Sequence, residues 1–339
     1  MKKILYLLLS ALLFATLSCN RQNSGDASSD GIETDTNNSG IETLTNRISR
    51  DSANAGLYQQ RALKYLEQRD PNKAMRDMLS AITLDPDNAG YMLTLSDIYL
   101  SMGLLDNCAE ALNKALDLDP DNTESMLKLA EIHLILRQYK EAIENADRAI
   151  AVDKSNPLPY FMKGYTYAEA GDTVNAIKSY LDAIDKDQGY YDAYMQLGLI
   201  YSTAGSRLAI DYFNNALNID PQSIEATYAL AKFYQDAGDA ESAISSYNKL
   251  LVLDPQNVYA QYNLGYVYLV LMGEYEQAIT FFDQALLIKP DYYEAVYNKG
   301  YCLELLGEYQ LARDMYNEVL EMETNYEKAV QGLNRIYGK

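Results

Sequence analysis

The chain has 339 residues, of which 48% are hydrophobic and 22% are charged, and its formal net charge is -20. This apolar fraction excludes a wholly disordered chain, and the pI near 4.4 argues against binding nucleic acid or anionic lipid through clustered Lys and Arg. Three Cys and one His are too few for a disulfide framework or a His-rich metal site.

The first 18 residues have the pattern of a secretory signal. Lys2 and Lys3 precede an apolar run from Ile4 to Leu17, which is shorter than the ~20 residues that span a bilayer. The sequence Thr-Leu-Ser-Cys that ends at Cys19 resembles a bacterial lipobox, which implies that Cys19 becomes the first mature residue and carries lipid. Ordinary signal cleavage, which would leave Cys19 as a thiol, is the alternative. Asn20 favours the outer membrane by the same resemblance.

Residues 19–39 are rich in Ser, Asn, Asp and Gly and have little to bury. The sequence therefore predicts a disordered tether between the anchor and a folded body.

The rest of the chain repeats with a period of 34 residues. Pro86 and Pro120 are 34 residues apart, as are Pro221 and Pro255, and degenerate copies divide the remainder at the same interval. We number each repeat so that this Pro is position 32. Position 8 is small in every copy, and so is position 20. Position 24 is mostly large, and we expect it to fill the space between neighbouring repeats.

These columns resemble the tetratricopeptide repeat, whose period is 34 residues. The resemblance implies an all-α, right-handed superhelical solenoid of antiparallel helix pairs, with eight repeats within residues 53–324 of a 40–339 solenoid. A solenoid must cover its terminal apolar faces. We therefore expect caps at about 40–49 and 326–337, with these apolar contacts: Ile41, Leu44 and Ile48 at one end, and Val330, Leu333 and Tyr337 at the other.

The residues with chemical potential occupy packing positions. His133 stands where most repeats have Tyr, and Cys108 and Cys302 stand at small inward positions. The segment from Asp85 to Gly90 resembles the start of a calcium loop, but the twelfth position is Ser96, where an EF-hand needs Glu. We find no catalytic constellation, and expect no enzyme activity, no cofactor and no metal.

In tetratricopeptide proteins the concave groove is lined by positions 2, 5, 9, 12 and 13 of the first helix. We expect the partner-binding groove residues here to be Phe161, Tyr165, Tyr228, Tyr259, Tyr262, Tyr266, Tyr297 and Tyr301. Met195, Lys232 and seven acidic residues share these positions: Asp97, Glu131, Glu169, Asp192, Glu225, Glu294 and Glu304. Tyr offers a large contact area at low entropic cost, although packing against neighbouring residues would explain the same rings.

The sequence thus favours a non-catalytic, lipid-anchored scaffold that binds an apolar or basic protein segment in the bacterial envelope. It would be attached to the outer membrane by lipid alone, facing the periplasm or the cell surface, and would not bind nucleic acid. The alternative is a glycan-binding outer-membrane lipoprotein of a nutrient-uptake system, because aromatic faces also stack on sugars.

Overall fold

The computed structural model describes residues 33–339, and within them it contains 18 α-helices and no strand. The predicted signal peptide, Cys19 and most of the predicted tether lie outside the described residues. No helix in the described part is both long enough and apolar enough to cross a bilayer.

The described chain divides into two compact units at Leu104, where the sequence predicts one continuous array. The division falls at the turn that follows Gly103, whose φ is +72°. The first unit contains these helices: α2 (Glu33–Arg50), α3 (Ala55–Glu67), α4 (Pro71–Leu84) and α5 (Ala89–Ser101).

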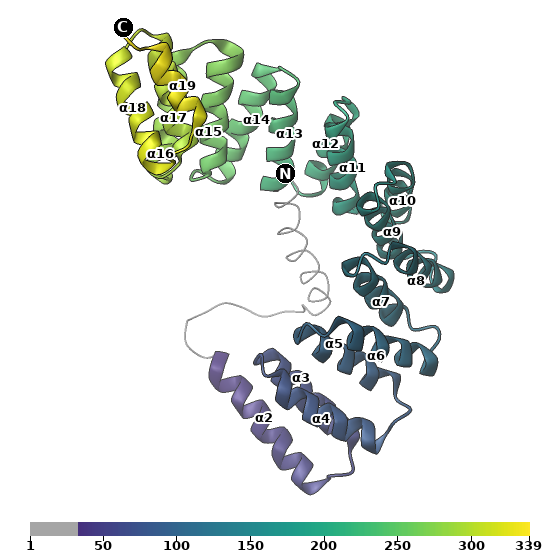
Figure 1. Cartoon of the computed structure of the whole chain (residues 1–339). Helices are drawn as coiled ribbons and strands as arrows, with labels where there is room; N and C mark the ends of the chain where they lie inside the picture. The colour runs from purple at the N-terminus through teal and green to yellow at the C-terminus, as the bar shows by residue number, and fades with distance from the viewer. Residues whose placement is uncertain (1–32) are drawn as a thin grey trace. The chain divides into compact units, whose positions relative to one another are not determined.

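The second unit begins at Leu105 and contains the remaining helices. They are α6 (Leu105–Leu118), α7 (Thr123–Ile135), α8 (Tyr139–Val152), α9 (Pro157–Glu169), α10 (Thr173–Lys186), α11 (Tyr191–Thr203), α12 (Leu208–Ile219), α13 (Ile224–Asp236), α14 (Ala240–Leu253), α15 (Val258–Val267), α16 (Tyr275–Ile288), α17 (Tyr293–Leu305), α18 (Tyr309–Met322) and α19 (Glu327–Arg335). A π-helical turn, η1 (Tyr268–Met272), follows α15. In Figure 1 the helices from α9 onward run as consecutive antiparallel pairs.

Five of the eight repeats begin with an Asn or Ser side chain that caps the first helix. The side chain of Asn122 accepts a hydrogen bond from the backbone N–H of Ser125, and Ser223 caps α13 through the N–H of Ala226. Asn88, Asn156 and Asn257 cap α5, α9 and α15 in the same way. These bonds satisfy backbone donors that the first helical turn leaves without a partner.

The small residue at position 8 allows the two helices of a repeat to approach closely. A Cβ atom built on Gly198 would lie 2.4 Å from the ring of Phe213 at position 24, and one on Gly265 would lie 2.7 Å from Phe282. The position-24 ring also reaches the next repeat, because Tyr316 lies against both Gly300 and Gly332. The expected packing is confirmed, with the ring serving its own repeat as well as its neighbour.

Position 15 ends the first helix in a left-handed conformation. It is Gly in six repeats, but Arg69 and Arg137 occupy it in the first and third repeats, each with φ of +58°. A side chain with a Cβ atom rarely adopts this conformation, so the turn is strained at both Arg residues.

The seventh repeat is one residue longer than the others, and η1 absorbs the extra residue. A single π turn accommodates an insertion without disturbing the helix on either side. The left-handed Gly273 then ends the helix, as its counterparts do in the other repeats.

At the N-terminal end, helix α2 packs on the first repeat and begins earlier than the predicted cap. Leu44 and Ile48 are buried against Leu57, whereas Ile41 is only partly buried. The helix starts at Glu33, so residues 33–39 are helical where the sequence predicts tether. No Pro interrupts 33–50, and a helix anchored by its packed second half can extend toward its N-terminus.

The C-terminal cap forms, but the sequence predicts its buried face wrongly. Ala329 and Ile336 are fully buried and Leu333 is partly buried, whereas Val330 is 43% exposed and Tyr337 is 90% exposed. Positions 3 and 10 of a first helix face the preceding repeat. Val330 and Tyr337 occupy positions that would face a second helix of their own repeat, and no second helix follows α19 within residues 33–339.

Candidate functional site

The residues predicted to bind a partner lie on the first helices of repeats four, six, seven and eight. Phe161 and Tyr165 are on α9 and Tyr228 is on α13. The rest are on α15 and α17: Tyr259, Tyr262, Tyr266, Tyr297 and Tyr301. We call the surface formed by positions 2, 5, 9, 12 and 13 of these helices and of α11 the first-helix face.

The rings at position 5 are packed between other aromatic rings. Tyr262 lies with its ring centroid 5.8 Å from Phe282 and 4.8 Å from Tyr292. The same arrangement recurs in two other repeats: Phe161 with Tyr180 and Tyr190, and Tyr297 with Tyr316 and Tyr326. Position 5 therefore joins positions 24 and 34 of its repeat, which explains part of the high Tyr content.

Two position-5 hydroxyl groups are also held by the following repeat. The amide of Asn298 donates to the Tyr262 hydroxyl at 2.9 Å, and Asn263 donates to Tyr228 at 3.2 Å. Burial raises the pKa of Tyr262 to about 12. This contact was not predicted, although Asn at position 6 of both repeat seven and repeat eight is visible in the sequence.

The other predicted tyrosines, at positions 2 and 9, differ in the exposure of their rings and in the residues that they contact. Tyr259 is 55% exposed and meets Tyr292 only edge-on. Tyr266 is half-buried, and the Tyr165 hydroxyl donates to Glu169 at 3.4 Å. Tyr301 stacks on Tyr297 and carries the guanidinium of Arg335 over its ring.

Two carboxylates in repeats five and six lack a compensating cation. Burial raises the pKa of Asp192, and burial together with the charge of Asp192 raises the pKa of Glu225. Neither side chain forms an ion pair within residues 33–339. Ionised groups in a partly dehydrated setting cost free energy unless a positive group approaches them.

Glu304, in repeat eight, is neutralised within the chain. Arg335 of α19 donates to both of its oxygens, at 2.8 and 2.9 Å, and the Tyr316 hydroxyl donates at 2.6 Å. Burial opposes ionisation of Glu304, but these bonds outweigh it and lower the pKa. The ion pair between Glu304 and Arg335 was not predicted from the sequence. Lys232 is likewise engaged, in an ion pair with Asp236.

The remaining candidates for chemistry occupy structural positions. Cys108 and Cys302 are buried, and burial raises the pKa of the Cys302 thiol to about 12. Nδ1 of the half-buried His133 lies 2.6 Å from the amide oxygen of Gln138. No group of three His, Cys, Asp or Glu side chains within the described part is placed to hold a metal ion.

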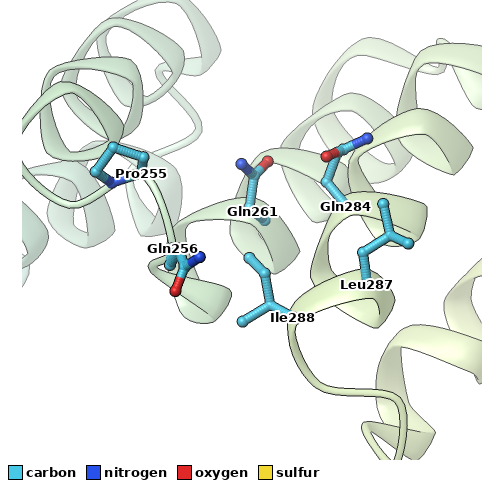
Figure 2. A pocket seen from close by; sticks show the side chains of 6 residues that line it. All are labelled: Pro255, Gln256, Gln261, Gln284, Leu287 and Ile288. Atoms are coloured by element: carbon cyan, nitrogen blue, oxygen red, sulfur yellow. The ribbon is translucent and has the colours of Figure 1, made fainter.

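A separate surface cleft of about 400 Å³ lies between α15 and α16, beside the turn that precedes α15. The residues that line it are Pro255, Gln256, Gln261, Gln284, Leu287 and Ile288. Figure 2 shows the amide ends of Gln261 and Gln284 facing each other across it. The buried Gln261 oxygen accepts no hydrogen bond from the described residues.

Solved structures of related fold share the helical architecture of this chain. The C-terminal part of a repeat-containing protein from Cytophaga hutchinsonii matches 68% of this chain and 95% of its own, with 17% identity and a TM-score of 0.55. A tetratricopeptide repeat protein from Parabacteroides merdae matches 74% of this chain and 99% of its own, with 18% identity and a TM-score of 0.50.

PilW, a type IV pilus biogenesis factor, matches 59% of this chain and 94% of its own, with 21% identity and a TM-score of 0.51. At these identities the likeness shows the fold alone. No curated protein sequence matches the chain.

Models of the tetratricopeptide repeat match the sequence along most of its length. The matched residues are 55–88, 89–122, 111–144, 159–188, 191–223, 228–291 and 269–335. The matches at 55–88 and 191–223 each span one helix pair and its turn, α3 with α4 and α11 with α12. The chain therefore belongs to the tetratricopeptide repeat family, whose fold is a scaffold for protein–protein interaction.

Proposed function

We propose that this protein is a lipid-anchored, non-catalytic scaffold of the bacterial envelope that binds a basic and apolar segment of another protein on its first-helix face. The observation that carries the proposal is a coupled pair of carboxylates: Asp192, which is half-buried, and Glu225, whose side chain is exposed at its outer end. Burial raises the pKa of both, and neither has a cation within the described chain. A Lys or Arg of a partner would offset the cost of keeping them ionised.

The aromatic contacts favour a protein partner over the glycan alternative. Stacking on a sugar requires an open ring face. Tyr262 and Tyr297 each contact further rings within their own repeat, so little of either face is free. Tyr259 is the most exposed of the predicted groove residues, and a single exposed ring suits an apolar side chain of a peptide.

Support for the anchor is the sequence that ends at Cys19. Cys19→Ala should remove label from cells grown with a radiolabelled fatty acid and should release the protein from the membrane fraction. Equal label in the wild type and the variant would remove the anchor from the proposal.

Site-specific photo-crosslinking in cells tests the binding face. A photoreactive residue at Thr203 or Tyr259 lies on exposed first-helix positions, whereas Val174 and Leu287 are exposed on second helices and serve as matched controls. We expect discrete protein adducts from the first pair and none from the controls. Equal adducts at all four sites, or none at the first pair, would contradict the proposal.

A further inference from the structure

The second residue of the first helix changes its chemical character between repeats six and seven. It is Asp192 in repeat five, Glu225 in repeat six and Tyr259 in repeat seven. Each belongs to the first turn of its helix, on α11, α13 and α15 respectively. We call these three residues the position-2 row. The row presents two acidic groups and then an aromatic ring, one in each of three consecutive repeats.

Hydrogen bonds join the three helices that carry the row. The Tyr191 hydroxyl on α11 lies 2.6 Å from the hydroxyl of Ser223, which caps α13. The amide of Asn263 on α15 donates to the Tyr228 hydroxyl of α13 at 3.2 Å. Packed helices lie about 8–10 Å apart, so we expect about this distance between consecutive members of the row.

The position-2 row contains carboxylates that no cation of the described chain compensates. Asp192 is half-buried, and its charge contributes to raising the pKa of Glu225. Farther along α13, at position 13, Asp236 is paired with Lys232. A cation of a partner therefore gains more at position 2 of this face than at position 13.

Tyr259 offers an apolar contact at the end of the row. Its side chain is 55% exposed and meets Tyr292 edge-on, with 6.4 Å between the ring centroids. The ammonium group of Lys289 lies 5.0 Å from the centre of the Tyr292 ring. A second cation beside these two rings would be repelled, so an apolar side chain fits over Tyr259 better than Lys or Arg does.

We propose that the partner segment binds along the position-2 row in a polyproline II conformation. A basic residue lies over Asp192, the third residue along is basic and lies over Glu225, and the third after that is large and apolar and lies over Tyr259. The inference rests on the proposed function and adds the order and spacing of the groups that the segment presents. In a segment that runs in the opposite direction the order is reversed, and the central residue is still basic.

The spacing of the row favours this conformation. Polyproline II has three residues per turn, so every third side chain points the same way at an interval of about 9.3 Å. A β-strand turns the third residue to the opposite face, and seven residues of α-helix span about 10.5 Å. Only the polyproline II interval falls within the separation of about 8–10 Å between packed helices.

A displayed library of short random peptides, selected on the full chain, is the probe. From the wild type we expect peptides with two basic residues and one large apolar residue at three-residue intervals, and with a basic residue in the middle. A permuted peptide of the same composition, with the apolar residue in the middle, should bind about tenfold more weakly, because it misplaces two of the three side chains.

Two exposed residues of repeat seven test the apolar end of the row. Tyr259→Ser should leave the melting temperature unchanged, and selection on it should keep the spacing of the basic residues but lose the apolar preference. A peptide selected on the wild type should bind this variant about tenfold more weakly. Val270→Ser is the matched control, because Val270 is 52% exposed on η1 but lies outside the row. It should keep the whole pattern and the wild-type affinity.

Glu225→Gln tests the central position. Selection on this variant should lose the preference for a basic residue in the middle and keep the basic and apolar residues on either side, six residues apart. A central basic preference as strong as in the wild type would overturn the assignment of that residue to Glu225.

The failures are distinguishable. Peptides enriched in basic and apolar residues without a fixed interval, or with an interval of seven, would overturn this inference and leave the proposed function standing. An apolar preference that survives in Tyr259→Ser would do the same. Retention of no peptide by the wild-type protein, or enrichment of acidic peptides, would contradict the proposed function, and the inference would fall with it.

Discussion

Repeats five and six and repeat eight present the same face of the same fold in different chemical states. In repeat eight, Glu304 is ion-paired with Arg335 and accepts from Tyr316. In repeats five and six, Asp192 and Glu225 have no cation among the described residues. The cap α19 covers the end of the array, whereas in the proposed function a partner supplies the missing groups in the middle of the face.

Deletion of α19 should cause the largest loss of stability among the changes considered. Deleting residues 325–339 exposes the apolar surface under Leu333 and Ile336, which should cost about 3–6 kcal/mol at ~1.5–3 kcal/mol per large side chain. Because each repeat contacts only its neighbours, protection from hydrogen exchange should be lost first in α17 and α18. Deleting only 337–339 removes the exposed Tyr337 and should leave exchange unchanged. Unaltered hydrogen-exchange protection in α18 after the longer deletion would contradict the proposal that α19 stabilises repeat eight.

The role of the position-5 rings is tested by separating two tyrosines on one helix. Tyr262→Ala removes a ring packed against Phe282 and Tyr292 and should cost about 3 kcal/mol, with a clear fall in melting temperature. Tyr266→Ala, on a half-buried ring without such contacts, should cost less than about 1 kcal/mol. Equal losses from the two variants would mean that the aromatic packing does not distinguish these positions.

The stability contributed by the ion pair between Glu304 and Arg335 should depend on pH. Arg335→Ala leaves the Glu304 carboxylate without its cation and should cost about 1–2 kcal/mol near pH 7. The pKa of Glu304 is lowered from 4.5, so the pair stabilises the fold above that pH and the contribution is lost as pH falls through the folded-state pKa. Denaturant melts should therefore converge for wild type and variant in acid. A difference that grows on acidification would contradict the assignment.

Asp192, which has no ion-pair partner among the described residues, should affect the pH dependence of stability in the opposite direction. The pKa of Asp192 is raised from 3.8, so ionisation costs stability at neutral pH and that cost disappears as pH falls below the unfolded-state value. Asp192→Asn should stabilise the free protein by up to about 1 kcal/mol at pH 7 and by less in acid. A variant less stable than wild type at pH 7 would show that Asp192 has a compensating partner in the chain.

The architecture could be predicted from the sequence because each structural requirement recurs at the same position in many repeats. Gly or Ala recurs wherever a position-24 side chain approaches the first helix, and Asn or Ser recurs at the caps, so one register accounts for them all. The buried face of cap α19 could not be predicted in this way. No second helix follows α19 within the described residues, so Val330 is exposed where a full repeat would bury it.

The candidate site was less predictable, because a Tyr on the first-helix face can bind or pack and the sequence does not say which. The contacts of Phe161 and Tyr262 depend on rings at positions 24 and 34, whose proximity follows only from the fold. The pairing of Glu304 with Arg335 joins residues 31 positions apart and has no counterpart in other repeats that could have revealed it.

The affinity of a peptide selected on the wild-type chain shows whether Asp192 and Glu225 take part in partner binding. The double variant Asp192→Asn with Glu225→Gln should bind it more weakly by about 1–2 kcal/mol, a factor of about 5–30, with a smaller salt dependence. Glu304→Gln, whose carboxylate is already paired with Arg335, should bind it like wild type when measured well below its melting temperature. Weaker binding by Glu304→Gln together with unchanged binding by the double variant would contradict the account.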